Sequence, residues 1–124
     1  MYKYRSLEAW KQAHAAVIAV LKATDTQRQP KTWALFDQLR RATISIEANI
    51  VEGYALGTTP LYQRHLRIAV GSAAEAESLI RVGLEVGYLS ESTGRELERL
   101  VGEALKNLIG LVRKRSSPFP ERVP

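Results

Sequence analysis

Apolar residues recur every three to four positions through most of the chain, and no segment alternates regularly between polar and apolar residues. This period is that of an amphipathic α-helix, whereas a half-buried strand would repeat every second residue. Polar residues, glycine and proline interrupt the pattern at three places, so it predicts four helices and no strands. The expected helices cover about residues 6–24, 31–52 and 60–86, and a last segment that begins near residue 90 or 93.

Capping residues set the expected ends of these helices. Ser6 suits the N-cap of the first helix, and Gly53 suits the position after the end of the second. Pro60 fits the first turn of the third helix, and Gly87 ends that helix. The last helix begins either at Ser90 or at the capping box that starts at Thr93. Because short connections join antiparallel neighbours, we predict an all-α, up-down-up-down antiparallel four-helix bundle.

The chain of 124 residues is long enough for one domain with its own core. We expect the bundle to occupy residues 1–115 and a flexible, proline-rich tail to occupy residues 116–124. The apolar arc of the last helix, over residues 97–112, is wider than one intramolecular face needs, which predicts a homo-oligomer. Gly71 inside the third helix predicts a close helix contact, because glycine there costs about 1 kcal/mol relative to alanine.

A polar stripe runs along the second helix between two apolar stripes, at spacings of three and four residues. A stripe in that place is partly buried, so its members must satisfy one another's hydrogen bonds. We expect Arg41, or Arg40, to pair with Glu75 of the third helix. An amide, a hydroxyl and a carboxylate in the stripe also allow a catalytic interpretation, but no cysteine or histidine joins them to activate a nucleophile, so we predict that the protein is not an enzyme. The structural polar network comprises Gln38, Arg41, Ser45, Asn49, Glu52 and Glu75.

The formal net charge is +5, and the surplus of basic residues lies in the terminal segments. In an up-down-up-down bundle the start of the first helix and the end of the last helix share one end of the molecule. Clustered basic side chains there predict phosphate-directed binding of nucleic acid, RNA or DNA. Cations at the end of the last helix also stabilise its dipole, which is the structural alternative. The predicted contact residues are Lys3, Arg5, Arg40, Arg113, Lys114 and Arg115.

Composition excludes several other classes of site. The chain has no cysteine, so disulfides, thiolate chemistry and cysteine zinc sites are ruled out. The only histidines, His14 and His65, have no metal-ligand spacing, and no phosphate-binding glycine loop follows a strand. We therefore expect no metal and no cofactor. The sequence lacks an apolar run of membrane-spanning length and a secretory leader, so we expect a cytoplasmic protein without a membrane partner.

Two motifs carry a resemblance to a known family: residues 38–53, QLRRATISIEANIVEG, and residues 68–75, IAVGSAAE. Their order and separation resemble the four-helix-bundle proteins encoded in intervening sequences of bacterial 23S ribosomal RNA genes. That family is similar in turn to the accessory variability determinant of diversity-generating retroelements, a pentamer that binds a reverse transcriptase and nucleic acid. The resemblance implies a bundle and a homopentamer. Glu47 stands where many relatives carry proline, and Leu56 stands where they often carry arginine.

The resulting functional hypothesis is a non-enzymatic oligomeric scaffold that binds nucleic acid through its basic end. The alternative is a protein-interaction scaffold that docks a partner protein in apolar grooves of the oligomer and binds no nucleic acid.

Overall fold

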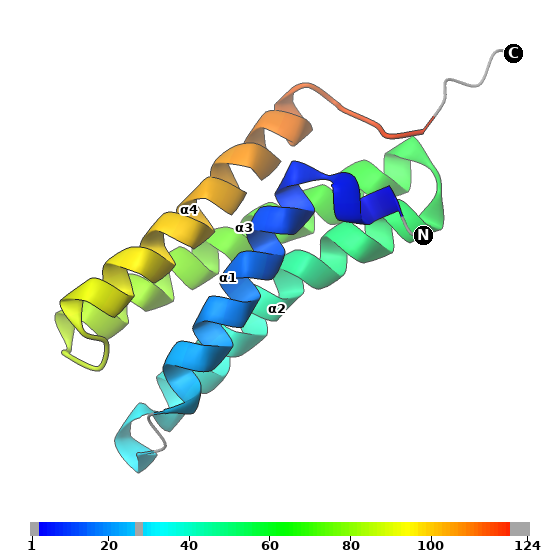
Figure 1. The fold of residues 1–124 in the computed structure, drawn as a ribbon. Coiled ribbons are helices and arrows are strands. Elements are labelled where there is room, and N and C mark those ends of the chain that lie inside the picture. Colours follow the sequence, from blue (N-terminus) through cyan, green and yellow to red (C-terminus); the bar gives the residue numbers. More distant parts are fainter. Residues whose placement is uncertain (1–2, 27–28, 120–124) are drawn as a thin grey trace, which may run out of the picture.

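The computed structural model describes residues 3–26 and 29–119, and these residues form only helices and connections (Figure 1). A short 3₁₀ helix, η1 (Lys3–Ser6), precedes four α-helices, and no strand occurs in the described residues. The prediction of an all-α chain with four long helices is confirmed. The helices are α1 (Glu8–Asp25), α2 (Pro30–Leu56), α3 (Thr59–Glu85) and α4 (Glu91–Arg113).

The four helices enclose one core, and each helix packs against two others (Figure 1). The most extensive contact joins α2 and α3, and α1 closes the arrangement by packing against both α2 and α4. Many of the buried residues of α1 and α3 are alanines, whereas α2 and α4 contribute mostly larger apolar side chains. The core includes Ala13, Ala16, Phe36, Leu39, Ile46, Ile50, Tyr62, Leu66, Ala69, Ala73, Leu97, Val101 and Leu108.

The two expected caps at one end of the molecule are wrong. The N-cap of α1 is Leu7, and Ser6 instead donates its hydroxyl to the carbonyl of Lys3 inside η1. Gly53 does not end α2, which continues to Leu56 and is capped by Gly57 at a positive φ of 74°. Glycine suits that left-handed position because it has no Cβ to clash with the following carbonyl.

Gly53 has a different reason to be glycine. A Cβ on Gly53 would lie 2.8 Å from the Cβ of His65 and 3.3 Å from the backbone oxygen of Tyr62. The residue is buried. Because it has no side chain, the backbone of α2 can lie directly against the Cβ atoms of α3. Gly53 is therefore a packing residue of the α2–α3 contact.

The predicted connection between α3 and α4 is confirmed. Gly87 follows the C-cap of α3 with a φ of 77°. Ser90 is the N-cap of α4, and its hydroxyl accepts a hydrogen bond from the backbone N–H of Thr93. That bond satisfies one of the donors that a helix start leaves unpaired.

The end of α4 turns the chain back over the bundle. The N–H of Ser116 donates to the carbonyl of Leu111, and the N–H of Arg115 donates to that of Val112, which is the bonding pattern of a Schellman motif. The left-handed residue of this motif is Arg115, with a φ of 50°, rather than glycine. A non-glycine residue there costs about 1–2 kcal/mol.

We expect Arg115→Gly to raise the free energy of unfolding by about 1 kcal/mol, because glycine relieves the left-handed strain while the turn is kept. Chemical denaturation of both proteins at the same salt concentration measures the change. Arg115→Ala removes the same charge without relieving the strain and serves as the control. Equal stabilisation by the two variants would show that charge, not backbone conformation, is responsible.

The described part of the tail is not detached from the bundle. The amide of Gln63 donates to the carbonyl of Ser116, and the hydroxyls of Ser117 and Thr59 lie 2.8 Å apart. The ring of Phe119 lies 5.7 Å from the ring centres of both Tyr54 and Tyr62. The segment from Ser116 to Phe119 thus bridges α4 to the α2–α3 connection, and residues 120–124 of the predicted tail lie outside the described residues.

The wide apolar arc of α4 is accounted for within the chain. Its large apolar residues are buried or half-buried, so the argument for an oligomer from α4 is wrong. Gly71, in contrast, is exposed, and a Cβ on it would meet nothing within 4 Å, so the predicted close contact is absent within the chain. The exposed large apolar residues include Ile18 and Leu21 of α1, Trp33, Ile44 and Leu56 of α2, and Leu61, Ile68 and Val82 of α3.

Candidate functional site

The basic residues predicted from the terminal segments border one end of the molecule. η1 carries Lys3 and Arg5, and its Tyr4 ring lies 6.3 Å from the ring of Tyr54, near the end of α2. The tail that follows α4 reaches the same tyrosine through Phe119. The start of the first helical region and the end of α4 therefore meet at this end of the molecule, which we call the basic end (Figure 1).

All five basic side chains of the basic end are exposed. The guanidinium of Arg5 lies 5.9 Å from the ring centre of Tyr4, a distance at which a cation interacts with the face of an aromatic ring. None of the five forms an ion pair with a described residue. The basic end consists of Lys3, Arg5, Arg113, Lys114 and Arg115.

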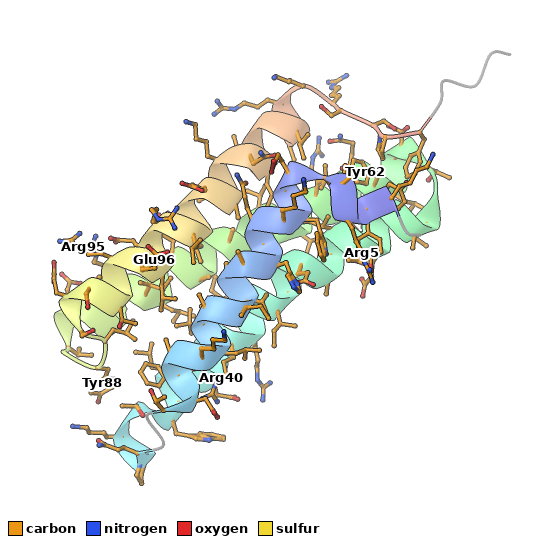
Figure 2. The ribbon with its side chains drawn as sticks, viewed as in Figure 1. Arg5, Arg40, Tyr62, Tyr88, Arg95 and Glu96 are labelled. Carbon is orange, nitrogen blue, oxygen red and sulfur yellow. The ribbon has the colours of Figure 1, made fainter. Side chains whose placement is uncertain are left out.

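Arg40 does not belong to the basic end. Its Nε donates to the hydroxyl of Thr24 at 2.8 Å, and its terminal nitrogen donates to the carbonyl of Thr24 at 3.0 Å. Thr24 is buried and donates in turn to the carbonyl of Val20. Arg40 thus satisfies the C-terminus of α1 at the end of the bundle opposite Arg5 (Figure 2), so its guanidinium has a structural contact there.

The other exposed arginines of α4 are neutralised locally. Arg95 contacts Glu91 and Glu98, and Arg99 contacts Glu96 and Glu103, all within one turn of the same helix. The hydrogen bond from Arg99 lowers the pKa of the Glu96 carboxyl. Among the described residues, ion pairs neutralise the arginines in the first half of α4 and leave Lys106 and Arg113 in its second half unpaired.

The polar stripe of α2 faces α3 through part of its length. Gln38 donates to Glu75, and the hydroxyls of Ser45 and Ser72 lie 2.8 Å apart. The order of these pairs shows that α2 and α3 run antiparallel, since the partner number falls as the α2 number rises. Two further members of the stripe, Asn49 and Glu52, both lie beside His65 of α3.

The centre of this network is Asn49. Its amide nitrogen donates to the carbonyl of Ser45 at 2.8 Å and to the hydroxyl of Ser45 at 3.1 Å. Its oxygen is therefore the acceptor, and the Nδ1 of His65 donates to it at 2.9 Å. A carboxylate oxygen of Glu52 lies 3.7 Å from the same Nδ1. His65 and Ser72 were not predicted as members, although both lie on one face of α3 at a spacing of seven residues.

Arg41 is the member of the predicted network that the structure places elsewhere. Its side chain is 73% exposed, and its Nε donates to Asp37 at 3.0 Å, one turn earlier on α2. The predicted pair with Glu75 is wrong because a carboxylate on the same helix satisfies the guanidinium, while the shorter Gln38 reaches Glu75. The expectation that no histidine joins the stripe is also wrong.

The arrangement of the network restricts what chemistry it can support. His65 contacts an amide and a carboxylate, and in the described residues no histidine nitrogen contacts a serine hydroxyl. A nucleophilic serine needs a base within hydrogen-bond distance of its hydroxyl. No group of three histidine, aspartate or glutamate side chains in the described residues could hold a metal ion.

The aromatic residues beneath the tail form the floor of the basic end. Tyr62 is 1% exposed, and this burial raises the pKa of its phenol, with a smaller contribution from Tyr54. Figure 2 shows Tyr62 at the end of the molecule that also carries Arg5.

Among the described helices, none combines the length and the apolar composition needed to cross a membrane.

Comparison with known proteins gives a family and a fold. Residues 5–110 match the family described as 23S rRNA-intervening sequence proteins. A solved structure of a protein of unknown function of the S23 ribosomal protein family, from Bacteroides thetaiotaomicron, superposes with a TM-score of 0.78 at 19% sequence identity. The match covers 85% of this chain and 98% of the other, and at this identity it shows the fold alone. No curated protein matches the sequence significantly.

Proposed function

The chain belongs to the 23S rRNA-intervening sequence protein family, and from that premise we propose that it is a non-enzymatic, oligomeric scaffold of the cytoplasm that binds nucleic acid through the basic end. The proposal includes an up-down-up-down bundle and assembly as a homopentamer, the subunit count that the resemblance to retroelement accessory proteins implies. The antiparallel order of the α2–α3 hydrogen bonds supports the bundle topology.

The observation that carries the proposal is the position of Lys3 and Arg5. Cations at the end of α4 stabilise its dipole, so Arg113, Lys114 and Arg115 have a structural explanation. Lys3 and Arg5 precede the start of α1, where the positive end of a helix dipole disfavours cations. Unpaired cations in that place are explained by a ligand that carries negative charge, and the repeated phosphates of nucleic acid supply it.

Binding should be directed at phosphates and sensitive to salt. We expect the purified protein to raise the fluorescence anisotropy of labelled RNA or duplex DNA and to lose affinity steeply as salt increases. Competition by heparin, a polyanion without bases, measures how much of the binding depends on negative charge alone. Absence of binding at low salt would contradict the proposal and leave the cations of α4 as stabilisers of the helix end.

Matched charge reversals test the position of the interface. Lys3→Glu combined with Arg5→Glu should weaken binding and flatten the salt dependence, because two phosphate contacts are lost. Lys11→Glu combined with Lys22→Glu changes the net charge equally at exposed positions of α1 without an ion pair. Equal weakening by the two pairs would indicate attraction by net charge rather than binding at the basic end.

The alternative function is a scaffold that docks a partner protein through apolar surface. The exposed apolar side chains on α1, α2 and α3 favour it. A partner captured equally by the wild type and by the Lys3→Glu, Arg5→Glu variant, with no nucleic acid bound by either, would support this alternative.

A further inference from the structure

Two grooves on the surface each contain one exposed large apolar residue, Ile44 or Ile68, and the charged side chains that line each groove carry one sign. The first surface is a groove formed by η1, α1 and α2, lined by Tyr4, Val17, Ile44, Ala48 and Val51 together with Glu47 and Glu52. Ile44 is the exposed large apolar residue of this groove, with 46% of its surface accessible. The lining contains two carboxylates and no lysine or arginine, and we call it the acidic groove.

A histidine lies beside each carboxylate of the acidic groove. The Nδ1 of His14 lies 3.1 Å from Glu47, and the Nδ1 of His65 lies 3.7 Å from Glu52. Glu52 remains 62% exposed. The groove therefore presents an apolar floor with a negative rim at defined positions.

The second surface is the outer side of α3, lined by Pro60, Gln63, Arg64, Arg67 and Ile68. Ile68 is 44% exposed, both arginines are exposed, and neither arginine forms an ion pair with a described residue. The lining contains no carboxylate, and we call it the basic face. Gly71 follows one turn later, and the open space around it would allow another backbone to approach.

We propose that the basic face of one copy of this chain docks in the acidic groove of a second copy. Ile68 would enter the apolar floor beside Ile44, and Arg64 and Arg67 would meet Glu47 and Glu52. The proposal rests on the self-association included in the proposed function and assigns its contact surfaces. The charge complementarity selects a second copy as the occupant, because both halves of the complement are present on this chain.

The two surfaces lie on different helices, so the contact is heterologous: each copy uses its groove for one neighbour and its α3 for another. Heterologous contacts repeat head to tail and produce a closed ring when the rotation between copies closes. In a symmetric dimer, by contrast, the groove and the basic face of one copy would both contact the same partner, and assembly would stop at two copies. The difference between a ring and a symmetric dimer can be tested by the mass of the assembly.

Two single substitutions separate the surfaces. Light scattering after size exclusion should show an oligomer for the wild type and the 13.9 kDa monomer for both Ile44→Glu and Ile68→Glu. Mixing the two variants leaves one intact groove and one intact basic face, so the mixture should form a complex of twice the monomer mass and nothing larger. Both residues are more than 40% exposed, and circular dichroism should show unchanged helix content in each variant.

Charge exchange provides the second test. Glu47→Arg with Glu52→Arg should dissociate the oligomer, as should Arg64→Glu with Arg67→Glu, and the chain that carries all four changes should reassemble. Glu8→Arg with Glu85→Arg, at exposed positions without ion pairs, should leave the mass unchanged. An oligomer that survives every groove and α3 variant would overturn the inference while leaving self-association intact. A wild type that is monomeric at micromolar concentration would overturn both.

Discussion

Gly53→Val is expected to lower the free energy of unfolding by about 3 kcal/mol, because the new side chain has no space between α2 and α3. Even the first added atom would lie 2.8 Å from the Cβ of His65, and that atom moves only with the α3 backbone. The valine methyl groups add further overlap, so the helices must separate at their most extensive contact. Denaturant titration followed by circular dichroism measures the loss.

Alanine provides a graded comparison and a matched control. Gly53→Ala should cost about 1–2 kcal/mol, since the steric penalty exceeds the gain of about 1 kcal/mol in helix propensity. Gly110→Ala makes the same change inside α4, where a Cβ would meet nothing within 4 Å, and it should be neutral or stabilising. Equal effects at the two positions would mean that Gly53 is not required by the α2–α3 approach.

The same glycine shows what the sequence could and could not predict about the helices. Period and capping residues correctly predicted four helices, and the Ser90 N-cap and Gly87 turn depend only on neighbouring residues. Gly53 was misread as the end of α2 because a glycine after an apolar run has two explanations, a left-handed cap or a close contact. Only the position of α3 distinguishes them, and that position is set by packing.

The candidate network was predicted in part for a similar reason. Spacing on one helix identified the α2 residues that face α3, and Ser45 and Asn49 do contact that helix or its side chains. Spacing alone does not determine where a long side chain ends, and Arg41 turned to Asp37 on its own helix. His65 was missed because its role depends on the angle at which α3 crosses Asn49.

The largest differences concern residues that contact distant parts of the chain. Composition predicts a flexible, proline-rich tail over residues 116–124, and it gives no sign that Phe119 in the described part of this tail packs against two tyrosines that lie far away in the sequence. Arg40 is among the predicted phosphate contacts, whereas in the structure it donates to the carbonyl of Thr24 at the C-terminus of α1. The periodicity of apolar residues describes one helix at a time, so it does not predict contacts between the ends of different helices.

Asn49→Leu is expected to lower the free energy of unfolding by about 2 kcal/mol. Leucine removes the hydrogen bonds to Ser45 and leaves the Nδ1 of His65, on a side chain that is 19% exposed, without its acceptor. An orphaned donor in a partly buried contact costs about 1–3 kcal/mol, which exceeds the gain from the added apolar surface. Thermal and chemical denaturation of the variant should both show the loss, with the helix content of the folded state unchanged.

A double-mutant cycle decides whether the cost arises from the His65 contact. In a His65→Leu background, Asn49→Leu should cost about 1 kcal/mol less, because no donor is then orphaned and two apolar groups meet across α2 and α3. Ser45→Ala with Ser72→Ala removes both hydroxyls of one pair together and should cost less than about 1 kcal/mol for the same reason. If Asn49→Leu instead cost the same in both backgrounds, the two side chains would be energetically independent and the stripe would be a solvated surface. Its residues would then be free for a ligand, and the assignment of binding to the basic end alone would have to change.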